Sequence, residues 1–430
     1  MSEPAGGNVS PPSGLGAMAA NRRILLASLV GTSVEFYDFY IYATAASLVF
    51  GPLFFSTATP ATQLVFSYAS FALAFLARPL GAAVFGHFGD RVGRKSTLVA
   101  SLLLMGGSTF LIALLPTYAQ VGWVAPLLLC ILRFGQGFGL GGEWGGAALL
   151  AVENAPPGWR ARFGMMPQLG APVGFIAANG LFMILGAVLT DAQFLAWGWR
   201  LPFLLSSILV LLGLWVRLSL TETREFAAAL AEAPPPAIPL AELLVHHWRQ
   251  AIGGMLGAIT CFALFYIATA FALGHTTVTL GLPREAMLGV QLGAILFLAL
   301  GILVAGWWAD KSSPRVVLAA GCALTLPLGA VFGYGLATPA PATIFAALAL
   351  ALFVMGLTYG PLGAWLTDAF PPRVRYSGSS FAFNLAGIFG GALAPNAALW
   401  LVTHHGVGAV GAYLSVAGVI SLLGLWIARR

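Results

Sequence analysis

Long apolar stretches alternate with short polar segments along almost the whole chain. Each apolar stretch has about 20 residues or more, the length that a helix needs to cross a bilayer. Because lipid cannot hydrogen-bond to the backbone, a spanning segment must satisfy its own peptide groups, and each stretch is therefore predicted to be a helix. Twelve spans are predicted, at 24–50, 63–87, 97–115, 123–150, 163–189, 200–218, 249–273, 286–309, 316–335, 342–366, 377–402 and 407–428.

Polar segments divide this pattern into four parts. Residues 1–21 are rich in Pro, Gly, Ser and Ala and are expected to form a disordered cytoplasmic tail. The first six spans follow in 22–220, and the last six lie in 249–430. Between them, residues 221–248 carry several charges and a proline run, which predicts a cytoplasmic linker with a short helix over 221–232.

The composition places the protein in the membrane class. Hydrophobic residues make up 59% of the 430 residues, charged residues make up only 8%, and the mean hydropathy is +0.90. Cys130, Cys261 and Cys322 all fall in apolar stretches, so neither a disulfide framework nor a metal cluster is indicated. No cofactor and no metal site are therefore predicted.

The basic residues are distributed unevenly over the two ends of the spans. If the amino terminus lies in the cytoplasm, sixteen of the twenty Lys and Arg residues lie on the cytoplasmic side, and only Arg200 and Arg284 lie outside. Cytoplasmic loops carry an excess of Lys and Arg, so this asymmetry predicts a multi-pass protein of the cytoplasmic (inner) membrane with both termini in the cytoplasm. It also explains the net charge of +6 without a nucleic-acid partner.

Five charged residues remain in the interior of the predicted spans, and all five belong to the first six. They are Glu35, Asp38, Arg78, Arg133 and Glu143. Placing a charge inside a span costs several kcal/mol, so such residues face a cavity, pair with one another or take part in transport. The charged chemistry of this protein is therefore expected in its first half.

Two acids share one face of the first span. Glu35 and Asp38 are three residues apart and lie roughly 16–21 Å from the start of the span at ~1.5 Å per residue, near the middle of the bilayer. Tyr42, one turn after Asp38, continues this face. A carboxylate at this depth can take up a proton on one side of the membrane and release it on the other, so Asp38, followed by Glu35, is predicted to couple protons. The alternative for each acid is a static ion pair with a buried arginine.

The fourth span combines an arginine with a run of glycines. Arg133, Gln136, Leu140 and Glu143 lie within an arc of about 80° on one helix face. The glycines form pairs with small-x-x-x-small spacing, which let a neighbouring helix approach closely. These pairs are Gly135 with Gly139, Gly137 with Gly141, Gly141 with Gly145, and Gly142 with Gly146.

Two roles are open for each buried arginine. A guanidinium group can hold a carboxylate through two parallel hydrogen bonds, which suits Arg133 to a substrate, but Arg133 is equally suited to be the permanent counter-charge of Asp38. Arg78, followed by Pro79, is either a second cation of the pocket or the structural partner of Glu35. The substrate-binding residues predicted in the first six spans are Arg78, Arg133, Gln136 and Tyr42.

A basic segment with several glycines, residues 86–95, separates the second span from the third and is expected to form a turn in water. Taken alone, it is also what a generic cytoplasmic loop looks like. Its sequence, GHFGDRVGRK, matches the loop motif G-x-x-x-D-R-x-G-R-[RK] of the major facilitator superfamily at every fixed position. The segment therefore resembles the loop between the second and third spans of that superfamily.

The resemblance extends over the whole chain. Residues 35–40, EFYDFY, are similar to the E-x-[FWY]-D-F signature of the metabolite:proton symporter family, as are the segments 133–147, 359–361, 370–378 and 384–391. That family includes carriers for citrate, 2-oxoglutarate, shikimate and proline/betaine. The resemblance implies an all-α membrane protein with twelve transmembrane helices in two pseudo-symmetric six-helix halves, which takes up a solute with protons and is not an enzyme.

Two positions depart from the pattern of this family. The repeat of the loop motif at 306–315 keeps Asp310 and its neighbouring bases but lacks the glycines, so the second half is not expected to latch in the same way as the first. Asp368 stands where the family usually has Glu, which is a mild change in a cytoplasmic loop.

A latch on the cytoplasmic side follows as a hypothesis. Asp90 is expected to cap the amino-terminal end of the eleventh span near Ser377, because an acid is favoured at that end of the helix dipole. Glu153 and Arg162 are expected to pair with an arginine of the 86–95 segment, although Glu153 is equally suited to be a solvated loop acid. The predicted gating residues are Gly86, Asp90, Arg91, Gly93, Arg94, Glu143, Glu153 and Arg162.

The last six spans offer only uncharged polar candidates for the pocket. Tyr266, Gln291, Tyr359 and Asn384 are placed to hydrogen-bond a substrate, and the alternative for each is a contact between helices. Of these, Tyr266, Tyr359 and Asn384 are predicted to bind substrate.

These observations predict a proton-coupled symporter that imports a small organic solute, a carboxylate metabolite, by alternating access. A zwitterionic osmolyte such as proline or betaine, or an exporter of the same superfamily, are the alternatives. A sensor would need a signalling domain, an enzyme a catalytic constellation, and a primary pump the motif G-x-x-x-x-G-K-[ST]; none is found in these 430 residues. The expected partners are the solute, protons and the lipid bilayer, with the chain acting as a monomer.

Overall fold

The computed structural model describes residues 14–92, 94–141, 143–218, 239–371 and 374–429, apart from the side chains of 86–98 and a few others. Over this part of the chain the fold is all-α. The first six spans consist of α2 (Arg22–Leu48), α4 (Pro60–Val92), α5 (Arg94–Ala113), α7 (Val124–Leu140) with α8 (Glu143–Glu153), α9 (Arg160–Gln168) with α10 (Gly170–Val188), and α12 (Leu201–Leu218). Short helices α3 (Phe50–Phe54), α6 (Tyr118–Val121), α11 (Asp191–Ala196) and η1 (Gly198–Arg200) connect them.

The last six spans contain several composite helices. They consist of α15 (Trp248–Tyr266), η2 (Ile267–Phe271), α16 (Ala272–Gly274) and η3 (His275–Thr279), then α17 (Arg284–Lys311), α18 (Pro314–Ala337), α19 (Pro341–Tyr359) with α20 (Leu362–Asp368), α21 (Arg375–Gly387), η5 (Ile388–Ala392) and α22 (Ala394–His405), and finally α23 (Gly408–Ile427). Ten described stretches are long and apolar enough to cross a membrane, and shorter apolar helices over Val99–Ala113 and Gly198–Leu211 lie at the predicted third and sixth spans. The twelve-span prediction is confirmed.

The turn predicted at 86–95 is narrower than expected. Helix α4 continues to Val92, and α5 already begins at Arg94. A helix satisfies its own backbone hydrogen bonds, so it can extend beyond the apolar stretch into water without cost to its peptide groups. Hydropathy therefore located the boundary of the membrane rather than the end of the helix.

The segments outside the spans are only partly described. Helix α1 (Gly14–Ala20) lies within the tail that was expected to be disordered, and α14 (Pro239–His246) forms the end of the predicted linker. The helix predicted at 221–232 lies outside the described residues.

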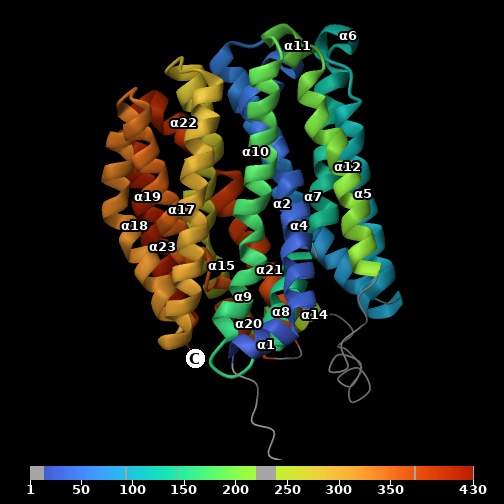
Figure 1. Cartoon of the computed structure of the whole chain (residues 1–430), viewed down its shortest axis with the longest axis vertical. Coiled ribbons are helices and arrows are strands. Elements are labelled where there is room, and N and C mark those ends of the chain that lie inside the picture. Colours follow the sequence, from blue (N-terminus) through green and yellow to red (C-terminus); the bar gives the residue numbers. More distant parts are fainter. Residues whose placement is uncertain (1–13, 93, 142, 219–238, 372–373, 430) are drawn as a thin grey trace, which may run out of the picture.

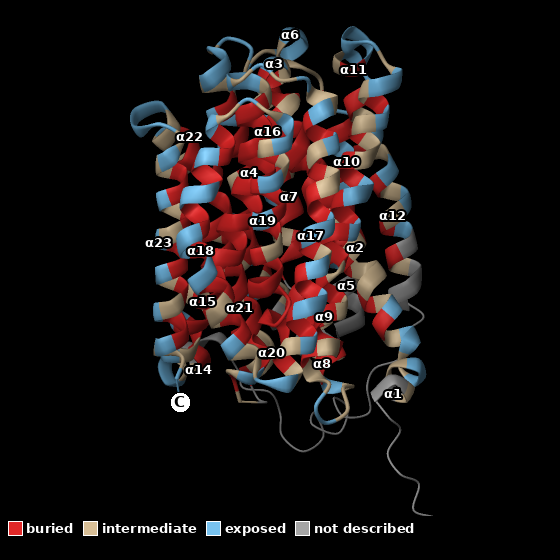
Figure 2. Cartoon of the chain, turned by 60° about the vertical axis from the view of Figure 1, so that its left-hand side comes forward, coloured by how far each residue is buried: buried red, intermediate tan, exposed pale blue. Residues whose placement is uncertain are grey.

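Large apolar side chains cover the outside of the molecule, and the charged side chains of the spans lie within a mainly apolar interior. Large apolar side chains are exposed along the outer surfaces of the helices, for example Val188, Ile208 and Trp426, at 63% or more of their area. The ionisable residues inside the spans of the first half, including Asp38 and Arg133, are buried instead. Figure 2 shows the buried residues concentrated along the axis of the bundle and the exposed ones on its outer surface and ends. This arrangement suits a helix bundle surrounded by lipid.

The first and last six spans form two helical halves that meet along the length of the molecule (Figure 1). Helix α4 of the first half packs against α21, η5 and α22 of the second, and α10 packs against α17. At the end that carries α1 and the carboxyl terminus, α8 and α9 contact α20. Helices α6 and α11 lie at the opposite end. The halves therefore contact one another near both ends of the spans.

Candidate functional site

The carboxylate of Asp38 is completely buried among helices of the first half. Ser206 of α12 donates a short hydrogen bond to its Oδ1, and the hydroxyl of Thr109 in α5 lies 3.4 Å from its Oδ2. In the described part of the chain, no arginine or lysine lies within ion-pair distance of Asp38. The static ion pair that was the alternative for this acid is therefore not formed in this state.

A bridge of polar side chains connects Asp38 with Arg133. One guanidinium nitrogen of Arg133, Nη1, donates a short hydrogen bond to the amide oxygen of Gln136. The amide nitrogen of Gln136 in turn donates to the hydroxyl of Thr109 (2.9 Å) and to the backbone oxygen of Asp38 (3.2 Å). The buried acid and the buried base are thus linked through Gln136 and Thr109 without touching.

The guanidinium group of Arg133 lies in a cage of aromatic rings. Its central carbon is 4.0 Å from the centroid of Tyr42, 4.4 Å from that of Phe39 and 4.9 Å from that of Phe71. The Tyr42 hydroxyl is hydrogen-bonded to Ser70 at 2.9 Å, which holds this ring in place. Attraction between a cation and ring faces replaces part of the hydration that Arg133 loses on burial.

The second buried arginine, Arg78 of α4, lies near the same rings. Its central carbon is 4.7 Å from the centroid of Phe39 and 5.6 Å from that of Phe75. Glu35 of α2, the structural partner considered for Arg78 from the sequence, is likewise buried. Glu143, predicted as a gating residue, is buried at the start of α8 and accepts a hydrogen bond from Ser101 of α5 (3.2 Å).

The three predicted substrate-binding residues of the second half have different surroundings in the structure. The ring of Tyr266 lies 5.3–6.1 Å from the centroids of Phe39, Phe71 and Phe75, next to both buried arginines. Asn384 instead donates to the backbone oxygen of Gly141 across the interface at 2.8 Å, which is the helix–helix contact considered as its alternative. Tyr359 is buried, with its hydroxyl unpartnered among the described residues.

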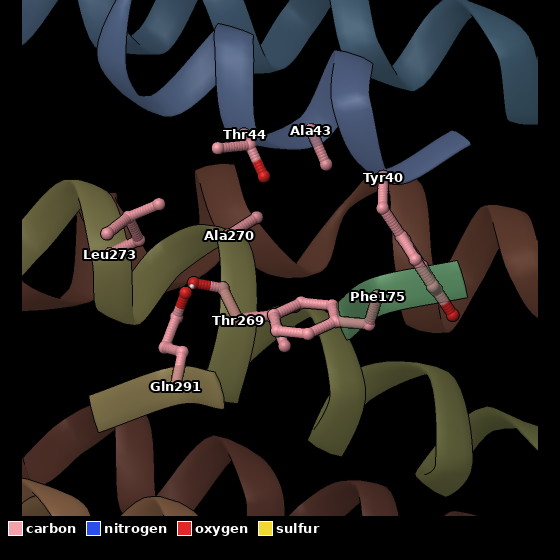
Figure 3. Close-up of a pocket in the computed structure, with 8 residues that line it drawn as sticks. All are labelled: Tyr40, Ala43, Thr44, Phe175, Thr269, Ala270, Leu273 and Gln291. Carbon is pink, nitrogen blue, oxygen red and sulfur yellow. Dashed lines mark hydrogen bonds between the residues drawn. The ribbon is translucent and has the colours of Figure 1, made fainter. Parts of the chain in front are cut away.

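A small cavity remains between the two halves, as Figure 3 shows. Tyr40, Ala43 and Thr44 of α2 and Phe175 of α10 line one side, and Thr269, Ala270, Leu273 and Gln291 line the other. Its volume is about 10 Å³, which is enough for about one water molecule. Gln291 donates to the backbone oxygens of Ala268 and Thr269, at 3.3 and 2.8 Å, in the π-helical turn η2. This cavity is too small for an organic solute, so the two halves are closed around it in this structure.

Asp310 caps a helix of the opposite half, although the sequence argued against a second latch. Its carboxylate accepts from the backbone nitrogens of Ala161 (2.8 Å) and Arg162 (3.1 Å) at the start of α9, and from Nε of Arg162 at 2.6 Å. Arg162 thus pairs with an acid of the second half, as expected for a guanidinium, whereas the side chains of its expected partners in the 86–95 segment lie outside the described residues. An acid at a helix amino terminus needs no glycine pattern to form this cap.

The other predicted gating residues are placed less completely. Gly93 lies outside the described residues, as do the side chains of Asp90, Arg91 and Arg94, and Gly86 lies within α4. Glu153 is exposed at the end of α8. On the same face, Arg160 pairs with Asp368 at 2.7 Å, although both side chains are more than 40% exposed.

The glycines of the fourth span perform the close packing that their spacing predicts. A side chain on Gly137 would overlap the backbone of Ala74 in α4, and one on Gly139 would meet the backbone of Ser101 in α5 at 2.7 Å. A side chain on Gly141 would overlap the backbone of Arg78. These contacts bring α4 and its arginine close to α7 and Arg133.

The hydroxyl residues around Asp38 and the ring that contacts both arginines were not predicted from the sequence. Thr109 and Ser206 lie in apolar spans, where Ser and Thr commonly bond to their own helix, so no sequence signal distinguished them. Phe39 was read only as part of the signature at 35–40. The aromatic residues of that signature were the available signal that rings surround the buried arginines.

Fold, buried charges and interface together define a secondary transporter. A family model described as "Major Facilitator Superfamily" matches residues 28–395, and the chain belongs to this superfamily. Its fold is similar to a crystal structure of a D-xylose–proton symporter, with a TM-score of 0.70 and 21% identity over 95% of this chain and 97% of that one. The protein is accordingly a multi-pass membrane transporter and not an enzyme.

Relatives within the superfamily are metabolite transporters, which confirms the resemblance to the metabolite:proton symporter family. The chain is 50% identical to the inner membrane metabolite transport protein YhjE of Escherichia coli over 94% of this chain and 93% of the relative. It is 38% identical to the shikimate transporter of Escherichia coli, covering 92% and 91%. It is 30% identical to the proline/betaine transporter of the same organism, covering 94% and 82%.

Proposed function

We propose that this protein is a proton-coupled symporter that imports a small organic carboxylate by alternating access. The observation that supports this most directly is the bridge from the Asp38 carboxylate through Thr109 and Gln136 to Arg133, buried in the first half. It places one group that can carry a proton within reach of one group that can hold a carboxylate. Asp38 and, second, Glu35 are the proton carriers in this proposal, and Arg133 is the main anion ligand.

The bridge suggests how the proton and the solute are coupled. When Asp38 is protonated from the outside, its charge no longer attracts Arg133, and the guanidinium is available to a carboxylate of the solute. When the proton leaves toward the cytoplasm, the negative charge returns and competes for Arg133 through Gln136 and Thr109. The solute is then released on the same side as the proton.

The remaining assignments complete the transport cycle. Arg78, Gln136, Tyr42, Tyr266 and Tyr359 contribute to the solute site, and Asn384 acts through the contact between the halves. The halves 22–220 and 249–430 rock about this site, joined by a cytoplasmic linker at 221–248. The protein acts as a monomer in the inner membrane with both termini in the cytoplasm, supported by the concentration of Lys and Arg on the face that carries α1 and the carboxyl terminus.

One observation favours a second solute class. The rings of Tyr40 and Phe175 line the cavity, and Tyr40 stacks on Phe265 of the other half with centroids 5.0 Å apart. Aromatic rings attract quaternary ammonium groups. A zwitterion such as betaine or proline is therefore the alternative substrate, in line with the proline/betaine transporter among the relatives. An exporter of the same superfamily is distinguished by the direction of flux.

The test is uptake of labelled shikimate, citrate, 2-oxoglutarate, a hydroxybenzoate, proline and betaine into cells that express the protein. Uptake is measured at acid and neutral external pH, with and without an uncoupler, for the wild type and Asp38→Asn. We expect uncoupler-sensitive uptake of a carboxylate that Asp38→Asn abolishes. Uptake indifferent to pH and uncoupler would contradict proton coupling, and uptake of betaine or proline alone would select the alternative.

A further inference from the structure

Phe39 is the ring that contacts both buried arginines. Its centroid lies 4.7 Å from the guanidinium carbon of Arg78 and 4.4 Å from that of Arg133. Among the described cation–ring contacts, Tyr42 and Phe71 face only Arg133, and Phe75 faces only Arg78. Two positive charges thus share one neutral ring, which is 1% exposed.

Both guanidinium groups keep donors without a hydrogen-bond partner in the described structure. Nε and Nη2 of Arg133 and Nε of Arg78 are buried and unpaired, and the two side chains are 0% and 8% exposed. Leaving a buried charged donor unpaired is costly, and such groups normally find an acceptor. The negative face of an aromatic ring offsets only part of this loss.

A carboxylate would satisfy these donors better than a ring does. It offers two oxygens with about four acceptor positions, and a guanidinium matches it with two parallel hydrogen bonds. We propose that Phe39 occupies a carboxylate position between Arg78 and Arg133 in this closed state, and that the carboxylate of the transported solute displaces the ring. The inference rests on the proposed function and extends it by naming Phe39 as the residue that keeps the anion site closed when no solute is bound.

The surroundings of Phe39 couple its displacement to the movement of the two halves. The rings of Phe71 and Phe75, at 5.2 and 5.0 Å, belong to α4 of the same half, whereas Tyr266, at 6.1 Å, belongs to α15 of the other. Separation of the halves withdraws Tyr266 and removes one wall of the ring's pocket. Phe39 can then leave the arginines as the solute arrives, and the empty carrier does not offer two bare cations to smaller anions.

The test uses acetate, the smallest stable carboxylate with an apolar group, on the purified full-length protein. Melting temperatures are measured in sodium acetate and in sodium chloride at equal ionic strength. The variants are Phe39→Leu, Phe39→Met and Phe39→Leu combined with Arg133→Gln. The matched control is Phe182→Leu, because Phe182 is also a fully buried ring, packed 6.1 Å from Phe194, and has no described contact with an arginine.

We expect acetate to stabilise Phe39→Leu and Phe39→Met at concentrations about ten-fold lower than it stabilises the wild type or Phe182→Leu, since contacts of a buried cation with a ring correspond to this order of affinity. The combined variant should lose the effect. Equal responses of Phe39→Leu and wild type, or a response retained without Arg133, would overturn the inference. So would aggregation of both Phe39 variants while Phe182→Leu remains monodisperse, because Phe39 would then be a structural core residue.

The uptake screen separates this inference from the proposed function. If acetate binds as expected but no carboxylate is transported, the anion site and the role of Phe39 stand, and carboxylate symport falls. If carboxylates are transported but acetate binds equally well with and without Phe39, the proposed carboxylate symport is supported and the proposed displacement of Phe39 is wrong.

Discussion

Trp144 of α8 and Phe383 of α21 stack face to face across the interface between the two halves. Their ring centroids are 3.6 Å apart, and the planes differ by only 1°. The Trp144 indole nitrogen also donates to Gln168 of α9 at 3.3 Å. Both rings are buried, and their helices lie toward the end that carries α1 and the carboxyl terminus (Figure 1), so we expect the rings to separate when a path to that face opens.

Replacing one ring of this pair by an aliphatic side chain should therefore favour opening of the transporter toward the end that carries the termini. For Phe383→Leu we expect efflux of the transported solute from preloaded vesicles to rise, by up to about ten-fold, because an aromatic pair contributes about 0.5–1.5 kcal/mol beyond its buried area. The control is Phe182→Leu, whose partner Phe194 belongs to the same half. Equal efflux from the two variants would show that the stack does not hold the halves together.

Loss of the helix cap formed by Asp310 should reduce solute accumulation more than loss of the ion pair formed by Asp368. The side chain of Asp310 is 4% exposed and serves two backbone nitrogens of α9 as well as Arg162, whereas Asp368 and Arg160 are 47% and 41% exposed. Surface pairs contribute about 0–1 kcal/mol, and removing one partner of a buried pair costs about 3–5 kcal/mol. We expect Asp310→Asn to lower the steady-state accumulation ratio several-fold and Asp368→Asn to leave it near the wild-type value. The same ratio in both variants would contradict a latch at Asp310.

Adding a methyl group to the close contact between α4 and α7 should destabilise the protein. A side chain at position 137 overlaps the backbone of Ala74, which cannot rotate away, and overpacking costs about 1–3 kcal/mol. Gly180 of α10 has open space around it, so Gly180→Ala is the matched control and should be neutral or slightly stabilising. The measurement is the melting temperature in detergent, and an unchanged value for Gly137→Ala would mean that the helices can separate at little cost.

Replacing Arg133 by lysine keeps the charge but removes the planar fork of donors. We expect the KM for a carboxylate solute to rise by about ten-fold or more, because an ammonium group cannot make the two parallel hydrogen bonds. Arg200→Lys is the control, since Arg200 also lies over a ring, that of Trp199 at 4.5 Å, but in the connecting helix η1 and not in a span. A KM unaffected by Arg133→Lys would show that Arg133 does not bind the solute.

The sequence was sufficient to predict the spans, because their length and apolarity are demanded by the bilayer itself. It also predicted that the glycines of the fourth span pack closely against another helix, which the contact of Gly137 with Ala74 confirms. It did not predict the π-helical turns η2 and η5, since hydropathy is insensitive to a change in hydrogen-bond register. The cap at Asp310 was missed for a different reason: its partners, the backbone nitrogens of α9, carry no sequence signature.

The amino-acid sequence by itself determined the class of fold, the residues that carry charge inside the membrane, and the family to which the chain belongs. Only the tertiary structure decided how those charges are related. It separates Asp38 from Arg133 by Gln136 and places the ring of Phe39 in contact with both Arg133 and Arg78. Spacing along one helix determines which residues share a face, but the rotation and approach of neighbouring helices, set by side-chain packing, determine which groups meet.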